Sequence, residues 1–178
     1  MQNWKDLYKE LSTTIQNNLT EIKWVDLWHN QVSFLESEHP FPTPAIFLGF
    51  RIQDAQDTGN KTQTVNLQLD CYVYYETFAD TYSGSWNQDS ALAFIGILND
   101  LYALLHGSFG TNYSSMRRIS MSPVDTGGAG NLYLVSFSCV LRDYAAQDDL
   151  IDIEVDDVIV EPGIAPERIE TDPIYVIP

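Results

Sequence analysis

Apolar residues recur every three or four positions at the start of the chain, which is the spacing of an amphipathic helix. The apolar positions are Trp4, Leu7, Tyr8, Leu11, Ile15, Leu19 and Ile22. Polar residues fill most of the positions between them, and Asn17, Asn18 and Thr20 weaken the end of the segment. We therefore expect this first helix to end near Leu19.

A second helical segment, residues 91–105, is apolar over most of its circumference. Asp89 and Ser90 precede it, and either can cap the N-terminus of a helix. His106 and Gly107 follow it, and a glycine after the last helical turn is typical of a helix C-terminus. A helix with so many apolar side chains is expected to be buried against a sheet.

The other apolar segments have the character of strands, at residues 23–28, 45–52, 65–74, 116–122 and 131–142. Residues 53–64 are polar and predict a hairpin loop. The strand at residues 65–74 alternates most clearly. Val65, Leu67, Leu69, Cys71 and Val73 point to one face, and Asn66, Gln68, Asp70, Tyr72 and Tyr74 point to the other. We expect the first face in the core and the second against water or another subunit.

This order of elements predicts an α+β fold. We expect a two-layer domain over residues 1–146, in which a mostly antiparallel sheet of four to five strands carries two main helices on one face. Residues 147–178 follow as an acidic, extended C-terminal arm.

The arm alternates apolar and acidic residues from Leu150 to Asp156, so an extended chain there has one apolar face and one charged face. Beyond Val160 the residues Pro162, Gly163, Pro166, Pro173 and Pro178 exclude a long helix. The apolar residues between the carboxylates, and the absence of a glycine within the run, argue against a calcium loop. The apolar face needs a surface to cover it, and a neighbouring subunit can supply one.

The charge of the chain is strongly acidic and unevenly distributed. The formal net charge is −16, with 25 acidic and 9 basic residues. Residues 147–178 hold 10 of the acidic residues and one of the basic residues, a net charge of −9. Such a field repels phosphate backbones, so tight binding of nucleic acid is not expected. The 44% of hydrophobic residues are enough to build a core.

Two cysteines, Cys71 and Cys139, lie in the middle of expected strands and are interpreted as buried free thiols. The first residues lack the basic and apolar stretches of a secretory signal. No apolar run approaches the ~20 residues of a membrane helix. The expected location is therefore a cytoplasm, without a membrane anchor.

No motif for catalysis or for a cofactor is found. The three histidines, His29, His39 and His106, share no metal-ligand spacing with cysteines or carboxylates. The glycine-rich residues 127–130 lack the lysine and helix of a phosphate-binding loop. The serines at positions 83 and 85 do not stand in a nucleophile-elbow motif. We expect a protein that is not an enzyme, with no metal and no cofactor.

The residues that remain are candidates for contacts between subunits. Arg117 and Arg118 form the only basic pair, which we expect to bind a carboxylate across a subunit boundary rather than DNA. Trp86 is expected to be exposed in the loop before the second helix. The full set of interface candidates is Asp70, Tyr72, Tyr74, Trp86, Arg117, Arg118, Ile151, Ile153 and Val155.

The chain resembles a family of phage proteins in the order of its elements. An amphipathic helix leads to a tryptophan-rich strand, a proline-rich entry at residues 40–44 into an apolar strand, and a hairpin. The apolar helix at residues 91–105 and a last strand that includes residues 136–141 complete the pattern. This pattern over residues 1–145 is similar to that of tail terminator and tail-completion proteins of tailed bacteriophages, also found in prophages and contractile injection particles. The arm is not part of that pattern.

The resemblance implies a structural role in virion assembly. The subunits would form a hexameric ring that caps the tail tube and joins it to the head connector. Double-stranded DNA would pass through an acidic lumen without sequence-specific binding. The protein would occupy the cytoplasm of the bacterial host during assembly and then the virion tail, without contact with a membrane.

Two alternatives stay open. The chain can be another neck, stopper or tail tube component of the same particle. It can also be a small ligand-binding or enzymatic α+β domain, with a pocket between the sheet and the helix at residues 91–105. Tyr72, Tyr74 and Tyr102 would line that pocket.

Overall fold

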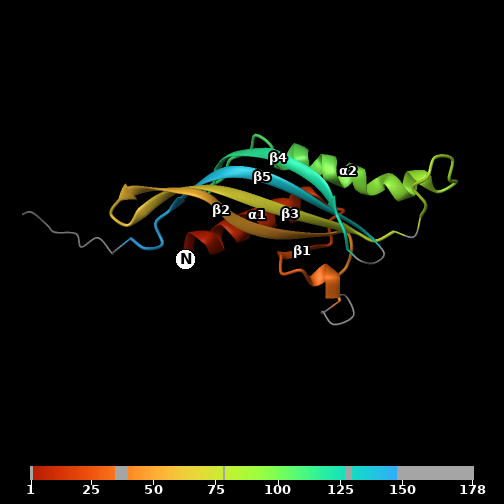
Figure 1. Cartoon of the computed structure of the whole chain (residues 1–178), viewed down its shortest axis with the longest axis horizontal. Coiled ribbons are helices and arrows are strands. Elements are labelled where there is room, and N and C mark those ends of the chain that lie inside the picture. The colour runs from red at the N-terminus through yellow and green to blue at the C-terminus, as the bar shows by residue number, and fades with distance from the viewer. Residues whose placement is uncertain (1, 35–39, 78, 127–129, 148–178) are drawn as a thin grey trace, which may run out of the picture. The chain divides into compact units, whose positions relative to one another are not determined.

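The computed structural model describes residues 2–34, 40–77, 79–126 and 130–147. Two helices, a short 3-10 helix and five strands follow one another in these residues (Figure 1). The elements are α1 (Gln2–Asn18), β1 (Trp24–Leu27), η1 (Gln31–Phe34), β2 (Ala45–Gly59), β3 (Thr62–Tyr75), α2 (Gln88–Leu105), β4 (Ser114–Val124) and β5 (Asn131–Asp143). The predicted arm lies outside the described residues, as does His39.

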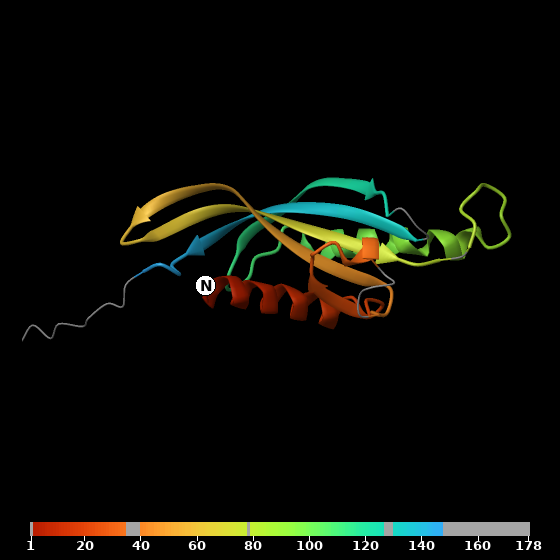
Figure 2. The same ribbon diagram turned by 60° about the horizontal axis from the view of Figure 1, so that its bottom comes forward.

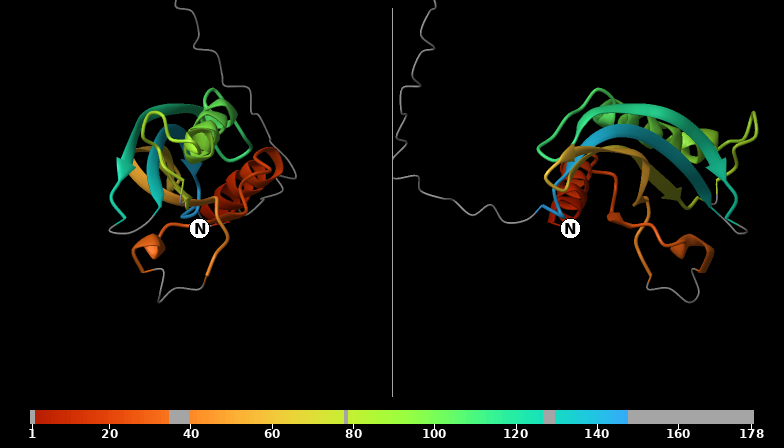
Figure 3. Two further views of the ribbon diagram at one scale, coloured as in Figure 1. Left: turned by 90° about the vertical axis from the view of Figure 1, so that its right-hand side faces the viewer. Right: turned by 60° about the vertical axis from the view of Figure 1, so that its left-hand side comes forward.

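The five strands form one sheet in the order β1-β2-β3-β5-β4. All neighbours are antiparallel except β1 and β2, which are parallel, so the sheet is mixed. Both helices pack on the same face of the sheet, as Figure 3 shows from two further directions. The predicted α+β class, with two helices on one face, is confirmed.

Helix α1 forms where the apolar spacing predicted it. Leu7, Leu11 and Ile15 lie one turn apart and are fully buried against the sheet. The side-chain amide of Asn18 donates to the carbonyl oxygen of Thr14 at 2.8 Å, in the last turn. The helix ends at Asn18, one residue before the predicted end.

Helix α2 begins earlier than its predicted cap. It starts at Gln88, and Asn87 is the N-cap residue, without a side-chain hydrogen bond to the helix. The expectation of Asp89 or Ser90 as the cap is therefore wrong; both lie in the first turn, where the charge of Asp89 favours the helix dipole. The C-terminus agrees with the prediction, because His106 is the C-cap and Gly107 has a φ of 78°.

The polar residues 53–64 were expected to form a loop, and most of them are strand instead. Strand β2 continues to Gly59, β3 resumes at Thr62, and the two pair almost to the turn. Gly59, Asn60 and Lys61 make the turn with positive φ angles. Every residue from Arg51 to Lys61 is exposed, so the polarity of this segment reflects two uncovered faces rather than a loop (Figure 2).

The main core lies between the sheet and the helices. Cys71 and Cys139 belong to it as free, buried thiols, as predicted. Burial raises the pKa of the Cys139 thiol to about 11 and that of Cys71 further, so both stay protonated at neutral pH. Cys139 is the register partner of Leu67, four residues from Cys71, or roughly 13 Å along the strand. That separation is too large for a disulfide.

Candidate functional site

The face of the sheet that carries neither α1 nor α2 is a candidate surface; we call it the open face. Register partners on neighbouring strands point to the same face, so the pairing arranges their side chains in rows across β2, β3, β5 and β4. Three rows lie at its centre: Arg51, Gln68, Ser138 and Arg117; Gly49, Asp70, Ser136 and Ser120; Phe47, Tyr72, Leu134 and Ser122. The first row is polar and carries an arginine at each end.

Asp70 is buried in the second row, with only 3% of its surface exposed. The hydroxyl of Ser136 donates to its Oδ1 at 2.6 Å, and the amide of Gln68 donates to the same atom at 2.7 Å. Arg51 lies 3.6 Å from Oδ2 and keeps most of its own side chain exposed. These partners satisfy the carboxylate, so Asp70 positions Arg51 and Gln68 rather than meeting a partner itself.

The aromatic end of the open face is covered by the connection between β1 and β2. The ring of Trp28 stacks on Tyr72 with centroids 3.9 Å apart. Phe41 packs edge-on against Tyr74, which is 1% exposed. The sequence placed Tyr74 against water or a subunit, and that expectation is wrong because this connection folds over it. The alternation itself is confirmed.

Gly130 packs directly against the ring of Tyr74 and leaves space for it. A Cβ at Gly130 would lie 2.8 Å from the ring, and the residue has a φ of 115°. Both observations require glycine there. The glycine-rich connection before β5 therefore has a packing role at Gly130, while residues 127–129 lie outside the described residues.

The basic pair of β4 divides between the two faces of the sheet. Arg117 is the register partner of Ser138 and is exposed on the open face. Arg118 is the partner of Phe137 on the helix side, and its guanidinium lies 3.7 Å from the centre of the Tyr102 ring. Neither arginine forms an ion pair with a carboxylate of the described residues. Arg117 is thus free for a partner, and Arg118 is held by α2.

Trp86 is 92% exposed, as the sequence predicted, in the loop between β3 and α2. Tyr82 in the same loop is also exposed. This loop follows the end of β3, whereas the β2–β3 turn precedes its start, so the two exposed segments lie at opposite ends of that strand (Figure 1). Trp86 therefore does not join the residues of the open face.

The pocket predicted between the sheet and α2 does not form. Tyr72 and Tyr74 belong to the cluster on the open face, whereas Tyr102 lies on the helix side beside Arg118. Strand residues alternate between faces, so the two tyrosines of β3 cannot point toward α2. The three side chains are not brought together.

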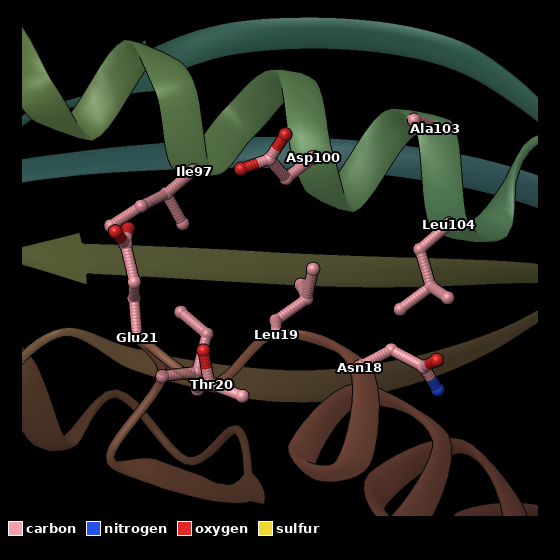
Figure 4. A pocket seen from close by; sticks show the side chains of 9 residues that line it. Asn18, Leu19, Thr20, Glu21, Ile97, Asp100, Ala103 and Leu104 are labelled. Carbon is pink, nitrogen blue, oxygen red and sulfur yellow. The ribbon is translucent and has the colours of Figure 1, made fainter.

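A groove exists elsewhere on the helix side, between the end of α1 and α2. Its volume is about 360 Å³, and Leu19, Ile97 and Leu104 point into it (Figure 4). Glu21 and Asp100 stand among the polar residues that line it. Such an arrangement suits an apolar group that carries a positive charge. No local sequence pattern predicts this groove, because its walls come from segments about 80 positions apart.

The described residues contain no group of three or more histidine, cysteine or carboxylate side chains that could hold a metal ion. His106 accepts a hydrogen bond at Nδ1 from the backbone N–H of Arg118 at 3.1 Å, which is a structural role. Neither described helix is long and apolar enough to cross a membrane. The candidates Ile151, Ile153 and Val155 lie outside the described residues.

Comparison with known proteins finds no family model that matches the chain and no curated protein with a matching sequence. Of the predicted interface residues, the open face brings together Asp70, Tyr72 and Arg117. Tyr74 is buried under the connection between β1 and β2. Arg118 lies on the helix side, and Trp86 lies in the loop between β3 and α2.

Proposed function

We propose that the chain is a structural assembly protein, a subunit of a ring that ends a phage-like tail tube and joins it to a head connector. The observation that carries the proposal is the sheet with one face left open. Helices α1 and α2 cover one face, and the other presents polar and arginine side chains over its centre. A surface of this kind suits a partner protein.

The outer edge of β2 supports the same proposal. Strand β1 pairs with only Ala45 to Leu48, so the rest of β2, as far as Gly59, has no neighbouring strand on that side among the described residues. An uncovered edge presents unpaired backbone groups that another chain can bind. Arg51, Asp54 and Asp57 place charges along it, which restricts the partners that fit.

The charge of the chain fits a ring through which DNA passes. A net charge of −16 per subunit repels the phosphates of a duplex, so the DNA would slide past without being held. A ring also requires heterologous contacts that close on themselves, in which two different surfaces of each subunit meet. In this proposal the open face of one subunit meets the acidic C-terminal sequence of the next. Another neck, stopper or tube component would use the same surfaces.

A small ligand-binding domain is the second candidate, and the groove between α1 and α2 favours it. Its apolar side chains and the carboxylates of Glu21 and Asp100 suit a cationic amphiphile. Isothermal titration with an alkylammonium ion tests this directly. Saturable binding that Leu104→Lys abolishes would support the ligand-binding function, and absence of binding would remove the support that this groove gives it.

Light scattering coupled to size-exclusion chromatography tests the assembly proposal. The full-length chain should form a closed oligomer as concentration rises, or on addition of tail tube. The expected mass is about six times the 20.2 kDa of one chain. A strict monomer under all these conditions, with saturable binding of a small ligand, would refute the proposal.

A further inference from the structure

The open face carries positive charge on a chain that is otherwise acidic. Arg51 and Arg117 end one row across four strands, with Gln68 and Ser138 between them. Arg142, also exposed, is the register partner of Thr64 farther along the same face. Three of the 9 basic residues of the chain thus gather on this surface. We call the row from Arg51 to Arg117 the arginine row.

The carboxylates near the arginine row do not prevent its two arginines from binding a further carboxylate. Asp70 is buried and holds one side of the Arg51 guanidinium, whose side chain remains 64% exposed. A guanidinium has five N–H donors, so Arg51 can still bind a second carboxylate. Arg117 has no carboxylate partner among the described residues. Asp54, the register partner of Asn66, brings one carboxylate to the adjoining row.

The spacing of the two arginines matches a repeat in the acidic C-terminal sequence. Three strand intervals separate Arg51 from Arg117, which is about 14 Å at ~4.8 Å per interval. Asp152 and Asp156 are four residues apart, which is also about 14 Å in an extended chain at ~3.4 Å per residue. Glu154 lies between them on the same side of the chain, where it would meet the amide of Gln68 and the hydroxyl of Ser138.

The way the chain leaves β5 favours a second copy as the source of that sequence. The carboxylate of Asp143, at the end of β5, accepts hydrogen bonds from Asn3, Trp4 and the N–H of Ala145. These bonds fix the exit five residues beyond Ser138, roughly 17 Å past the arginine row. The described chain then continues beside the β2–β3 turn, away from its own row (Figure 2).

We propose that residues 152–156 of a second copy bind across the arginine row, with Asp152 and Asp156 on the two arginines. The proposal rests on the self-assembly proposed above and names the surfaces that meet. Ile151, Ile153 and Val155 would then face the copy that supplies the segment, which buries both sides of the segment at the subunit boundary. The occupant is recognised by two charge-assisted, bidentate contacts about 14 Å apart.

Charge reversal in the full-length chain tests the proposal. Arg117→Glu should raise the concentration needed for assembly at least tenfold, because one cationic end of the row becomes anionic. Lys9→Glu is the matched control, since Lys9 is exposed on α1 and the change in charge is the same. Lys9→Glu should assemble like the unmodified chain, and circular dichroism should be the same for all three proteins.

Cross-linking between differently labelled copies identifies the source of the segment. A chain with Arg117→Cys is mixed with a chain carrying Asp152→Cys or Asp156→Cys, and a short bismaleimide is added. The expected product is a covalent dimer, which a Lys9→Cys chain does not give with either partner. Cys71 and Cys139 are buried and should not react.

The outcomes separate this inference from the proposed function. If Arg117→Glu assembles like the unmodified chain, the docking site is wrong and the assembly protein stands. If a chain with Arg117→Cys and Asp156→Cys cross-links only within itself at a concentration at which the unmodified chain assembles, the segment binds its own copy and the inference fails. A strict monomer that yields no covalent dimer contradicts the docking and the self-assembly together.

Discussion

Glu10 and Asp143 are two carboxylates that fasten helix α1 to distant parts of the chain. Glu10 accepts hydrogen bonds from the backbone N–H groups of Thr111 and Asn112, at 2.6 and 3.0 Å, and from the side-chain amide of Asn112 at 2.8 Å. Gly110 leaves the space that the Glu10 carboxylate fills, since a Cβ there would collide with it. These bonds join α1 to the loop that leads into β4.

Replacing Glu10 by alanine should lower the free energy of unfolding by about 2 kcal/mol, because three donors lose a charged acceptor. Urea unfolding followed by circular dichroism measures the loss. Glu21→Ala is the control, since Glu21 is exposed and accepts no comparable set of bonds. Equal losses for the two variants would show that the Glu10 contacts do not stabilise the fold.

Asp143 gives stability that depends on pH. Burial alone would raise the pKa of its carboxyl, but hydrogen bonds from the Ala145 backbone, the Trp4 indole and the Asn3 amide outweigh it and lower the pKa below its usual value. A lowered folded-state pKa means that the stabilisation is complete above the unfolded-state value and is lost as pH falls through the folded-state value. Asp143 therefore stabilises the fold at neutral pH and not in strong acid.

The variant Asp143→Asn should be less stable than the unmodified chain at pH 7, and the difference should shrink below about pH 4. Urea midpoints measured from pH 7 to pH 2 give the curve. Asp54→Asn, at an exposed position, is the matched control for the change of charge. A stability difference for Asp143→Asn that stays constant over this range would contradict the assigned pKa shift.

At the scale of elements, the connection between β1 and β2 decides how much of the open face is available. Trp28 and Phe41 cover Tyr72, Phe47 and Tyr74. The uncovered part of the face is therefore polar, and the aromatic part is a second small core. This arrangement leaves the arginine row exposed beside a packed aromatic cluster.

Two tryptophans with opposite environments test the role of this connection. Trp28→Ala should cost about 3 kcal/mol of unfolding free energy, because it removes a stacked ring and uncovers Tyr72. Trp86→Ala should cost less than about 0.5 kcal/mol, since its side chain is 92% exposed. The same urea experiment measures both. Similar small losses for the two variants would mean that the connection does not stabilise the open face.

The sequence predicts the elements whose periodicity has one buried side. Leu7, Leu11 and Ile15 mark α1, and the alternation from Val65 to Val73 marks the core face of β3. The sequence pattern does not predict the strands within residues 53–64, because a strand with both faces exposed has the composition of a loop. It also misses the start of α2, where Asn87 is the N-cap residue without a side-chain bond that a sequence pattern could suggest.

The candidate site is predictable only in part, for a related reason. Alternation assigns Asp70 and Tyr72 to the face away from the core, as observed. The arginine row depends on the register of four strands that come from distant segments, and no local pattern contains that register. The burial of Tyr74 likewise depends on the distant residues Phe41 and Gly130.

At the scale of the whole molecule, the charge and the exposed surfaces both fit the proposed ring. The chain carries a net charge of −16, yet its open face carries three exposed arginines. Two unlike surfaces on one subunit favour heterologous contacts, which close into a ring or continue as a filament. The proposed ring must close, so the number of subunits in the assembled particle is the decisive quantity.

Electron microscopy of the full-length chain, above its assembly concentration or on tail tube, measures that number directly. We expect closed rings of six subunits with a central opening, and Arg117→Glu should reduce their number while Lys9→Glu should not. Two-fold dimers, open filaments, or particles that stay monomeric under both conditions would contradict the ring.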